Sequence, residues 1–263
     1  MTSNFETLTL ERDDRGVARL TFNRPDKHNA LNDVMILDLR RAAAELAEDD
    51  EVRLVVLTGA GKSFCAGGDI QWFTRTLKKS RAGRMGEATE LAHMLYDLNH
   101  LPKPLIGRVQ GPAYGGGVGM ISVCDVTIGT LGSRFGLTEV RLGLIAATIS
   151  PYVISAIGTR QARRYFITGE SFDAKEAKRM GLVHIVVTDG GEMLAARDRL
   201  LRHIHEAAPK AARAAKDLVA AVRARPVDDA MIEDTALRIA TRRASAEGIE
   251  GLSAFLDKRK PEW

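Results

Sequence analysis

The sequence predicts an α/β protein built around a largely parallel sheet. Short apolar runs at residues 54–57 and 104–109 alternate with longer segments of helical periodicity. Parallel strands need a crossover connection, usually a helix, so this alternation favours one layered core. The 263 residues suffice for one large domain, and 45% apolar with 27% charged residues is an ordinary globular balance.

The first half of the sequence predicts a hairpin, a helix and a buried strand, in that order. Apolar runs at residues 8–11 and 17–23 flank the turn-like segment 13–16 and predict a β-hairpin. Asn32 precedes apolar residues at helical spacing and is expected to cap a helix. The buried strand at 54–57 ends in a glycine-rich loop, and helical sequence is expected from Asp69 towards Asn99.

The second half begins with the apolar run at 104–109. A helix entered through glycines is expected over residues 115–123, followed by a brief strand at 126–128. Beyond Glu139 the sequence predicts mostly helices. We therefore expect an α/β core over residues 1–200 and a helical C-terminal region over residues 201–263.

Charge and cysteine content narrow the class of protein. The net charge of +4 is spread out and the aromatic content is only 5%, so no nucleic-acid partner is expected. No run approaches the ~20 apolar residues of a membrane span, and the N-terminus lacks the apolar core of a signal peptide. Cys65 and Cys124 form no metal-ligand pattern and fit a reducing compartment, so we expect a cytoplasmic protein without a metal.

Two motifs that suggest other functions are incomplete. Residues 59–63 (GAGKS) resemble the end of a P-loop, but Val56 stands where the pattern needs its first glycine. A serine-hydrolase elbow, G-x-S-x-G, is missing from the sequence. The six histidines show no metal spacing, and His203 and His205 would point apart on a helix.

Two glycine loops are the informative features. The first, residues 58–70, joins a buried strand to a helix, which would by itself suit an ordinary β–α connection. The second, residues 110–119, places Gly115, Gly116 and Gly117 at a helix start. Such a run costs ~1 kcal/mol per glycine in a helix interior, but it lets a ligand approach unpaired N–H donors. Backbone donors of this kind suit a developing oxyanion.

Together with Cys124-Asp125 and the segment 135–139 (FGLTE), these loops closely resemble the enoyl-CoA hydratase/isomerase (crotonase) family. Further matches are Asn23-Arg24-Pro25 with residues 29–31, the stretch 167–183, and residues 251–260, so the resemblance covers nearly the whole chain in order. It implies a crotonase-like ββα superhelix core, a helical C-terminal trimerisation region, and a homotrimer or homohexamer. The implied substrate is an acyl-CoA thioester, with no cofactor beyond the coenzyme A of the substrate.

The resemblance also assigns roles to residues. Gly68 and Gly116 match the backbone donors of the oxyanion hole, and Glu139 matches a catalytic acid. Gly119 stands where two-acid hydratases have their first glutamate, so one carboxyl group would serve as base and then acid. Positions matching the path of coenzyme A are Ala66, Gly67, Asp69 and Ile70, with Phe255 and Lys258 near the C-terminus. Tyr114, His93, Thr148 and Ser150 are possible helpers.

The implied reaction is hydration of a 2-enoyl-CoA. Residues 142–152 are similar to bacterial hydratases of the methylglutaconyl-CoA and isohexenylglutaconyl-CoA type, whose substrates have a second carboxylate that Arg141 could meet. A Δ3–Δ2 enoyl-CoA isomerase also needs one carboxyl group and stays open. A hydrolase or dehalogenase of the same fold, and a non-catalytic CoA- or RNA-binding member, are further alternatives.

Overall fold

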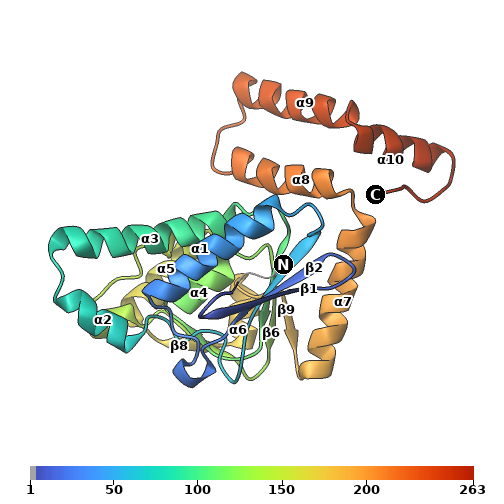
Figure 1. Ribbon diagram of the computed structural model, residues 1–263. Coiled ribbons are helices and arrows are strands. Elements are labelled where there is room, and N and C mark those ends of the chain that lie inside the picture. Colours follow the sequence, from blue (N-terminus) through green and yellow to red (C-terminus); the bar gives the residue numbers. More distant parts are fainter. Residues whose placement is uncertain (1–3) are drawn as a thin grey trace.

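A six-stranded sheet forms the centre of the protein, whose computed structural model describes residues 4–263 (Figure 1). The first two strands are antiparallel and every other neighbouring pair is parallel. The predicted hairpin and parallel core are therefore confirmed. In spatial order the strands are β1 (Leu8–Arg12), β2 (Val17–Phe22), β3 (Leu54–Gly59), β4 (Leu105–Val109), β6 (Val126–Thr130) and β9 (Ile185–Val187).

Helices cover both faces of this sheet. On β3, Val55 and Leu57 join the larger apolar core, while Leu54 and Val56 join a smaller one on the opposite face. This two-sided burial explains why the strand reads as an unbroken apolar run. The larger core lies under α1 (Asp33–Glu48), α3 (Arg81–Asn99) and α4 (Gly116–Ser122), and the smaller under α7 (Gly190–Glu206).

Local signals set the helix starts. Asn32 caps α1 by accepting a hydrogen bond from the Met35 N–H at 2.9 Å, and Asp69 caps α2 (Ile70–Leu77). Both starts agree with the prediction. Gly115, with φ of +50°, precedes α4, which begins at Gly116, one residue later than expected.

Short strands were missed by the sequence analysis. β5 (Ala113–Tyr114), β7 (Arg134–Gly136) and β8 (Ser171–Asp173) form a second, three-stranded sheet, and β9 closes the main sheet. The expectation of a mostly helical chain beyond Glu139 therefore omitted β8 and β9, because two or three residues are too few to show a strand period. The helices of that region are α5 (Ser150–Thr168) and α6 (Ala174–Met180).

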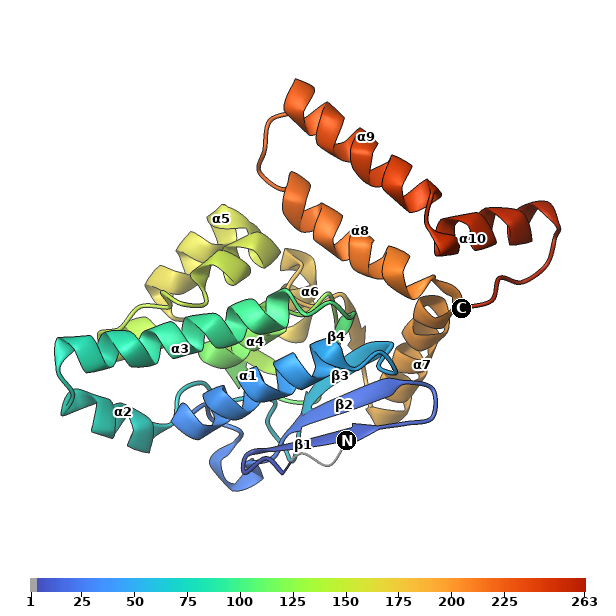
Figure 2. The same cartoon turned by 45° about the horizontal axis from the view of Figure 1, so that its top comes forward.

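The C-terminal helices stand apart from the sheet. Figures 1 and 2 show α8 (Pro209–Val222), α9 (Asp229–Arg243) and α10 (Ala246–Leu256) extending to one side of the core. α7 spans residue 200 and packs Met193, Ala196 and Leu201 against the sheet. The part that extends from the core thus begins after α7.

Candidate active site

The two glycine loops lie side by side. The loop after β3 and the loop after β4 are joined by a hydrogen bond from the Tyr114 N–H to the Cys65 carbonyl, at 3.0 Å. The first loop is also held to the segment before α1, by a hydrogen bond from the Leu31 N–H to the Gly67 carbonyl at 2.7 Å. Segments that are about 50 residues apart in sequence therefore form one backbone surface around Gly68 and Gly116.

Close backbone approach explains the three glycines of the second loop. A Cβ atom on Gly117 would lie 2.3 Å from the Cys65 carbonyl oxygen, and one on Gly116 would lie 2.7 Å from Leu31 Cδ1. Gly115 also has the positive φ that side chains disfavour. The glycines thus have a packing reason as well as the ligand-access reason that the sequence suggested.

Free backbone donors are available on this surface. Among residues 4–263, neither the Gly68 N–H nor the Gly116 N–H donates a hydrogen bond to a protein acceptor. Gly116 is the first residue of α4, where an N–H has no partner within the helix. The geometry gives both residues the free donor that an oxyanion hole requires.

Glu139 places a carboxyl group against these loops. It begins the 3₁₀ helix η2 (Glu139–Leu142), and its Oε1 lies 3.0 Å from where a Cβ atom of Gly115 would stand. Its Oε2 is buried and has no hydrogen-bond partner within the described chain. Burial raises the pKa of Glu139 above its ordinary 4.5, although a bond from its own backbone N–H partly opposes the shift.

Gly119 contributes no cleft surface. It is buried, and a Cβ atom there would lie 2.3 Å from Ile149 Cγ2, so Ile149 fills the space beside it. Ile149 itself lines the cleft. A carboxylate at position 119 would therefore clash with Ile149, which explains physically why this chain has one acid at the loops.

The cleft beside the loops has a volume of about 330 Å³ and mostly apolar walls. From α2, Trp72 and Phe73 stack with their ring centroids 5.7 Å apart, and the Phe73 ring lies against Gly68. Leu91 of α3 and the segment 142–149 complete the walls. These surroundings suit an acyl chain, and their low polarity strengthens electrostatic interactions at the carboxyl group.

Glu87, the second acid in the cleft, is already hydrogen-bonded to protein donors. Its carboxylate accepts hydrogen bonds from Trp72 Nε1 at 2.8 Å, Thr76 Oγ1 at 2.7 Å and Lys79 Nζ at 2.7 Å. Burial alone would raise the pKa of Glu87, but these donors outweigh it and lower the pKa. Glu139 is thus the carboxyl group that is free for proton transfer.

The residues expected along the coenzyme A path fall into two groups. Ala66 and Gly67 line the cleft, whereas Asp69 and Ile70 lie outside its lining. Asp69 is buried in an ion pair with Arg24 Nη2, at 2.8 Å, and caps α2; the Ile70 side chain is 81% exposed. The structure therefore gives Asp69 a role in positioning the loop.

Phe255 and Lys258 lie far from the loops within one chain. Phe255 is 80% exposed on α10, and Figure 1 places α10 at the opposite end of the molecule from α2. Lys258 follows α10 and is exposed. These two residues could approach a cleft only if that cleft belonged to another copy of the chain.

Of the possible helpers, Tyr114 and Thr148 line the cleft and His93 and Ser150 do not. The Ser150 hydroxyl donates to the Ala147 carbonyl at 2.8 Å, which closes the turn before α5. Sequence reasoning missed Trp72, Phe73 and Leu91. In the sequence they are apolar residues within predicted helical segments, so only their position in the cleft reveals them.

Two further properties concern binding. Within residues 4–263, no three His, Cys, Asp or Glu side chains are grouped so that they could hold a metal ion. In the same range, no helix has both the length and the apolar character to cross a membrane.

Comparison with known proteins identifies the fold and family. Residues 12–263 match the family model described as "Enoyl-CoA hydratase/isomerase". A crystal structure of an enoyl-CoA hydratase from Shewanella pealeana superposes with a TM-score of 0.95 at 36% identity, covering 98% of this chain and 96% of that one. A putative enoyl-CoA hydratase of Thermus thermophilus is 33% identical over 247 residues, 94% of this chain and 97% of its own length. A probable enoyl-CoA hydratase of Rhizobium meliloti is 35% identical over 272 aligned positions, 99% and 98% of the two chains.

The architecture is the crotonase fold, as the sequence predicted. This chain belongs to the enoyl-CoA hydratase/isomerase family.

Proposed function

We propose that this protein is an enoyl-CoA hydratase that adds water across the 2,3 double bond of an enoyl-CoA thioester. The observation behind the proposal is the Glu139 carboxyl group, whose buried Oε2 has no hydrogen-bond partner among residues 4–263, beside the free N–H groups of Gly68 and Gly116. We further propose that the reaction needs no cofactor beyond the coenzyme A of the substrate.

The reaction needs one proton acceptor and two backbone donors. Ionised Glu139 takes a proton from water as the water oxygen bonds to C3 of the substrate. Electrons of the double bond move onto the thioester oxygen, where the N–H groups of Gly68 and Gly116 stabilise the enolate. Protonated Glu139 then returns the proton to C2, so that one water is added and the carboxylate is regenerated.

The test is turnover of a panel of 2-enoyl-CoA and 3-enoyl-CoA thioesters, followed by product mass. We expect a gain of about 18 mass units (one water), and a kcat roughly 10²–10⁴-fold lower in Glu139→Gln. An unchanged mass with a shifted double bond would assign the isomerase instead, because one carboxyl group also suffices to move a proton between C2 and C4. Tight coenzyme A binding without any turnover would favour a non-catalytic member of the family and would overturn the proposal that the protein is an enzyme.

For the substrate, we propose a branched, glutaconyl-type acyl group with a second carboxylate. Arg141, first expected to meet that carboxylate, is exposed beside Gly169 and lies outside the cleft lining. The cationic side chain of the lining is Arg84 of α3, which has no ion-pair partner among residues 4–263. An apolar cleft with a free guanidinium at its edge suits an acyl group that ends in an anion.

The substrate proposal is tested with Arg84→Met and the matched control Arg81→Met, which removes a charge from the same helix outside the cleft. Because Arg84 is exposed, we expect KM for 3-methylglutaconyl-CoA to rise only about two- to tenfold in Arg84→Met. KM for crotonyl-CoA should not change. Equal effects on both substrates would reject the role of Arg84 and leave the hydratase standing.

We also propose a homotrimer, or a hexamer of paired trimers, located in the cytoplasm. Support for the assembly comes from the exposed apolar side chains of α8 to α10, among them Phe255, at 80%. In such an assembly Phe255 and Lys258 would help to hold the coenzyme A bound by a neighbouring copy. The location rests on the two free thiols, Cys65 and Cys124, which suit a reducing compartment.

A further inference from the structure

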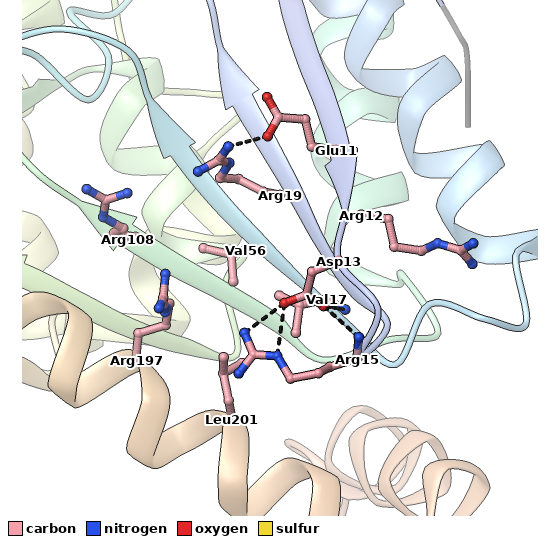
Figure 3. A pocket seen from close by; sticks show the side chains of 10 residues that line it. All are labelled: Glu11, Arg12, Asp13, Arg15, Val17, Arg19, Val56, Arg108, Arg197 and Leu201. Carbon is pink, nitrogen blue, oxygen red and sulfur yellow. Dashed lines mark hydrogen bonds and ion pairs between the residues drawn. The ribbon is translucent and has the colours of Figure 1, made fainter.

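A second cavity lies on the sheet face that is opposite to the catalytic cleft. It has a volume of about 210 Å³ and lies between the β1–β2 hairpin, the middle strands and α7 (Figure 3). Val56 and Leu201, both of the smaller apolar core, form its floor. The cavity and the catalytic cleft share no lining residue, so the cavity is a separate feature of the fold.

Arginines dominate this cavity, with five of them and only two acids in the lining. The acids are already engaged. Asp13 accepts hydrogen bonds from the Arg15 Nε and Nη2, at 3.0 and 2.7 Å, and Glu11 pairs with Arg19. Of the remaining lining arginines, Arg12 pairs with Asp49 and Glu51, and Arg197 pairs with Asp198, which leaves Arg108.

Arg108 is the unbalanced group. Its side chain is half-buried on β4 and forms no hydrogen bond or ion pair with any residue between 4 and 263, and its Nε is fully buried. Burial, and then the nearby charges of Arg197 and Arg19, lower the pKa of the Arg108 guanidinium. A buried cation without a counter-charge destabilises the fold, so the chain holds here a group that an anion would stabilise.

The neighbours of Arg108 come from three elements. Arg19 lies opposite Val56 in the pairing of β2 with β3, and Arg108 lies opposite Thr58 in the pairing of β3 with β4. Both side chains therefore rise from the same face, on either side of β3. Arg197 reaches them from α7, and Figure 3 shows the three guanidinium groups around one space.

All three arginines keep donors for a ligand. Arg197 uses Nε and Nη2 on Asp198, at 2.9 and 2.7 Å, which leaves its Nη1 free. The side chain of Arg19 is 50% exposed, and its Nη2 pairs with Glu11. No donor of the Arg108 guanidinium group is engaged by a residue between 4 and 263. Planar guanidinium donors match the oxygens of phosphate, which can accept hydrogen bonds from several arginines at once.

We propose that Arg19, Arg108 and Arg197 form a binding site for a phosphate-type anion, either free phosphate or a small phosphate monoester. The bound anion would bridge β2, β4 and α7, and would supply the counter-charge that Arg108 lacks.

The experiment measures thermal unfolding and calorimetric binding of the full chain with inorganic phosphate or glycerol phosphate, at constant ionic strength set with chloride. We expect a saturable rise in Tm in the wild type, and binding at least about tenfold weaker in Arg108→Leu and in Arg197→Gln. Arg199→Leu is the matched control, because Arg199 is exposed on the same helix outside the cavity. Tighter binding of one probe identifies the source of the phosphate group.

A second signature separates this site from general salt effects. Without phosphate, Arg108→Leu should unfold at the same or a higher temperature than the wild type, since it removes an uncompensated cation. Adding phosphate should raise the Tm of the wild type relative to this variant. The proposal is overturned if phosphate raises both Tm values equally, or if it raises neither.

Discussion

At the scale of single residues, the two acids of the cleft differ in their environments, and this difference supports the role that we propose for Glu139. Two acids line the cleft, but three donors hold Glu87 as a carboxylate, whereas burial favours the neutral form of Glu139. A carboxyl group whose pKa lies nearer to neutrality can both take and return a proton at similar cost. The difference between the two acids arises from their partners, because their side chains are chemically identical.

Glu139→Gln should make the protein more stable at neutral and alkaline pH. The pKa of Glu139 is raised in the folded state, so its carboxyl group favours folding below its ordinary value of 4.5. That contribution is lost as pH rises from 4.5 through the raised pKa. Thermal unfolding should therefore give a higher Tm for the variant at pH 8 and equal values below pH 4.5. A wild type that is more stable at pH 8 would contradict the burial argument.

Gly119→Ala should destabilise the protein through one contact. The added Cβ would lie 2.3 Å from Ile149 Cγ2, so one of the two must move, at a cost of about 1–3 kcal/mol. In an Ile149→Ala background the same change should cost less, since Cγ2 is gone and only the Ile149 Cβ contact, at 2.8 Å, is kept. Urea unfolding of the wild type, the two single variants and the double variant measures this coupling. Additive changes in the free energy of unfolding would rule out the clash.

At the scale of elements, the start of α2 determines where Gly68 lies. Asp69 accepts hydrogen bonds from the Gln71 and Trp72 N–H groups at 2.8 and 3.3 Å, and pairs with Arg24. Burial alone would raise the pKa of Asp69, but Arg24 and the two N–H groups outweigh it and lower the pKa. The ionised side chain thus fixes the helix next to the first backbone donor.

Asp69→Asn should cost about 3 kcal/mol at pH 7. The amide oxygen can still cap α2, but Arg24 would keep a charge without a counter-charge in a largely buried place. Because the pKa of Asp69 is lowered, its stabilisation is present above pH 3.8 and is lost as pH falls through the lowered pKa. Denaturant unfolding across this range should show the difference shrinking on acidification, while a constant difference would point to lost capping alone.

At the scale of the whole molecule, the C-terminal helices leave apolar surface uncovered. Leu237 of α9 and Leu252 of α10 are 65% and 55% exposed, and α8 to α10 project from the core. Such clustered exposure is unusual for a monomer and marks an interaction surface. In the assembly that we propose, a neighbouring copy would cover it and would bring Phe255 and Lys258 to the cleft of another chain.

Replacing Leu237 and Leu252 together by lysine should dissociate the assembly. Light scattering after size exclusion should give three or six times the mass of one chain for the wild type and a smaller particle for the double variant. Lysines at Leu194 and Leu131, which are exposed outside α8 to α10, serve as the control for added charge. A wild type with the mass of one chain would refute the proposed assembly.

The sequence by itself determined the fold class, the hairpin, the helix start at Asn32 and the two glycine loops. These features depend on local chemistry, namely the spacing of apolar residues, side chains that cap helices, and glycines where the backbone comes close to other atoms. Gly68, Gly116 and Glu139 could be selected from the sequence because their motifs are local and their order along the chain is that of a known family.

Only the tertiary structure decided what surrounds those residues. Ile149 beside Gly119, Phe73 on Gly68 and Arg24 opposite Asp69 are contacts between segments whose meeting no local pattern encodes. The same holds for the place of Arg84 in the cleft lining, from which Arg141 is absent, and for Arg108 without a counter-charge. Burial and interaction partners set the charge state of a side chain and the groups that it can contact. Burial and partners are properties of the folded chain.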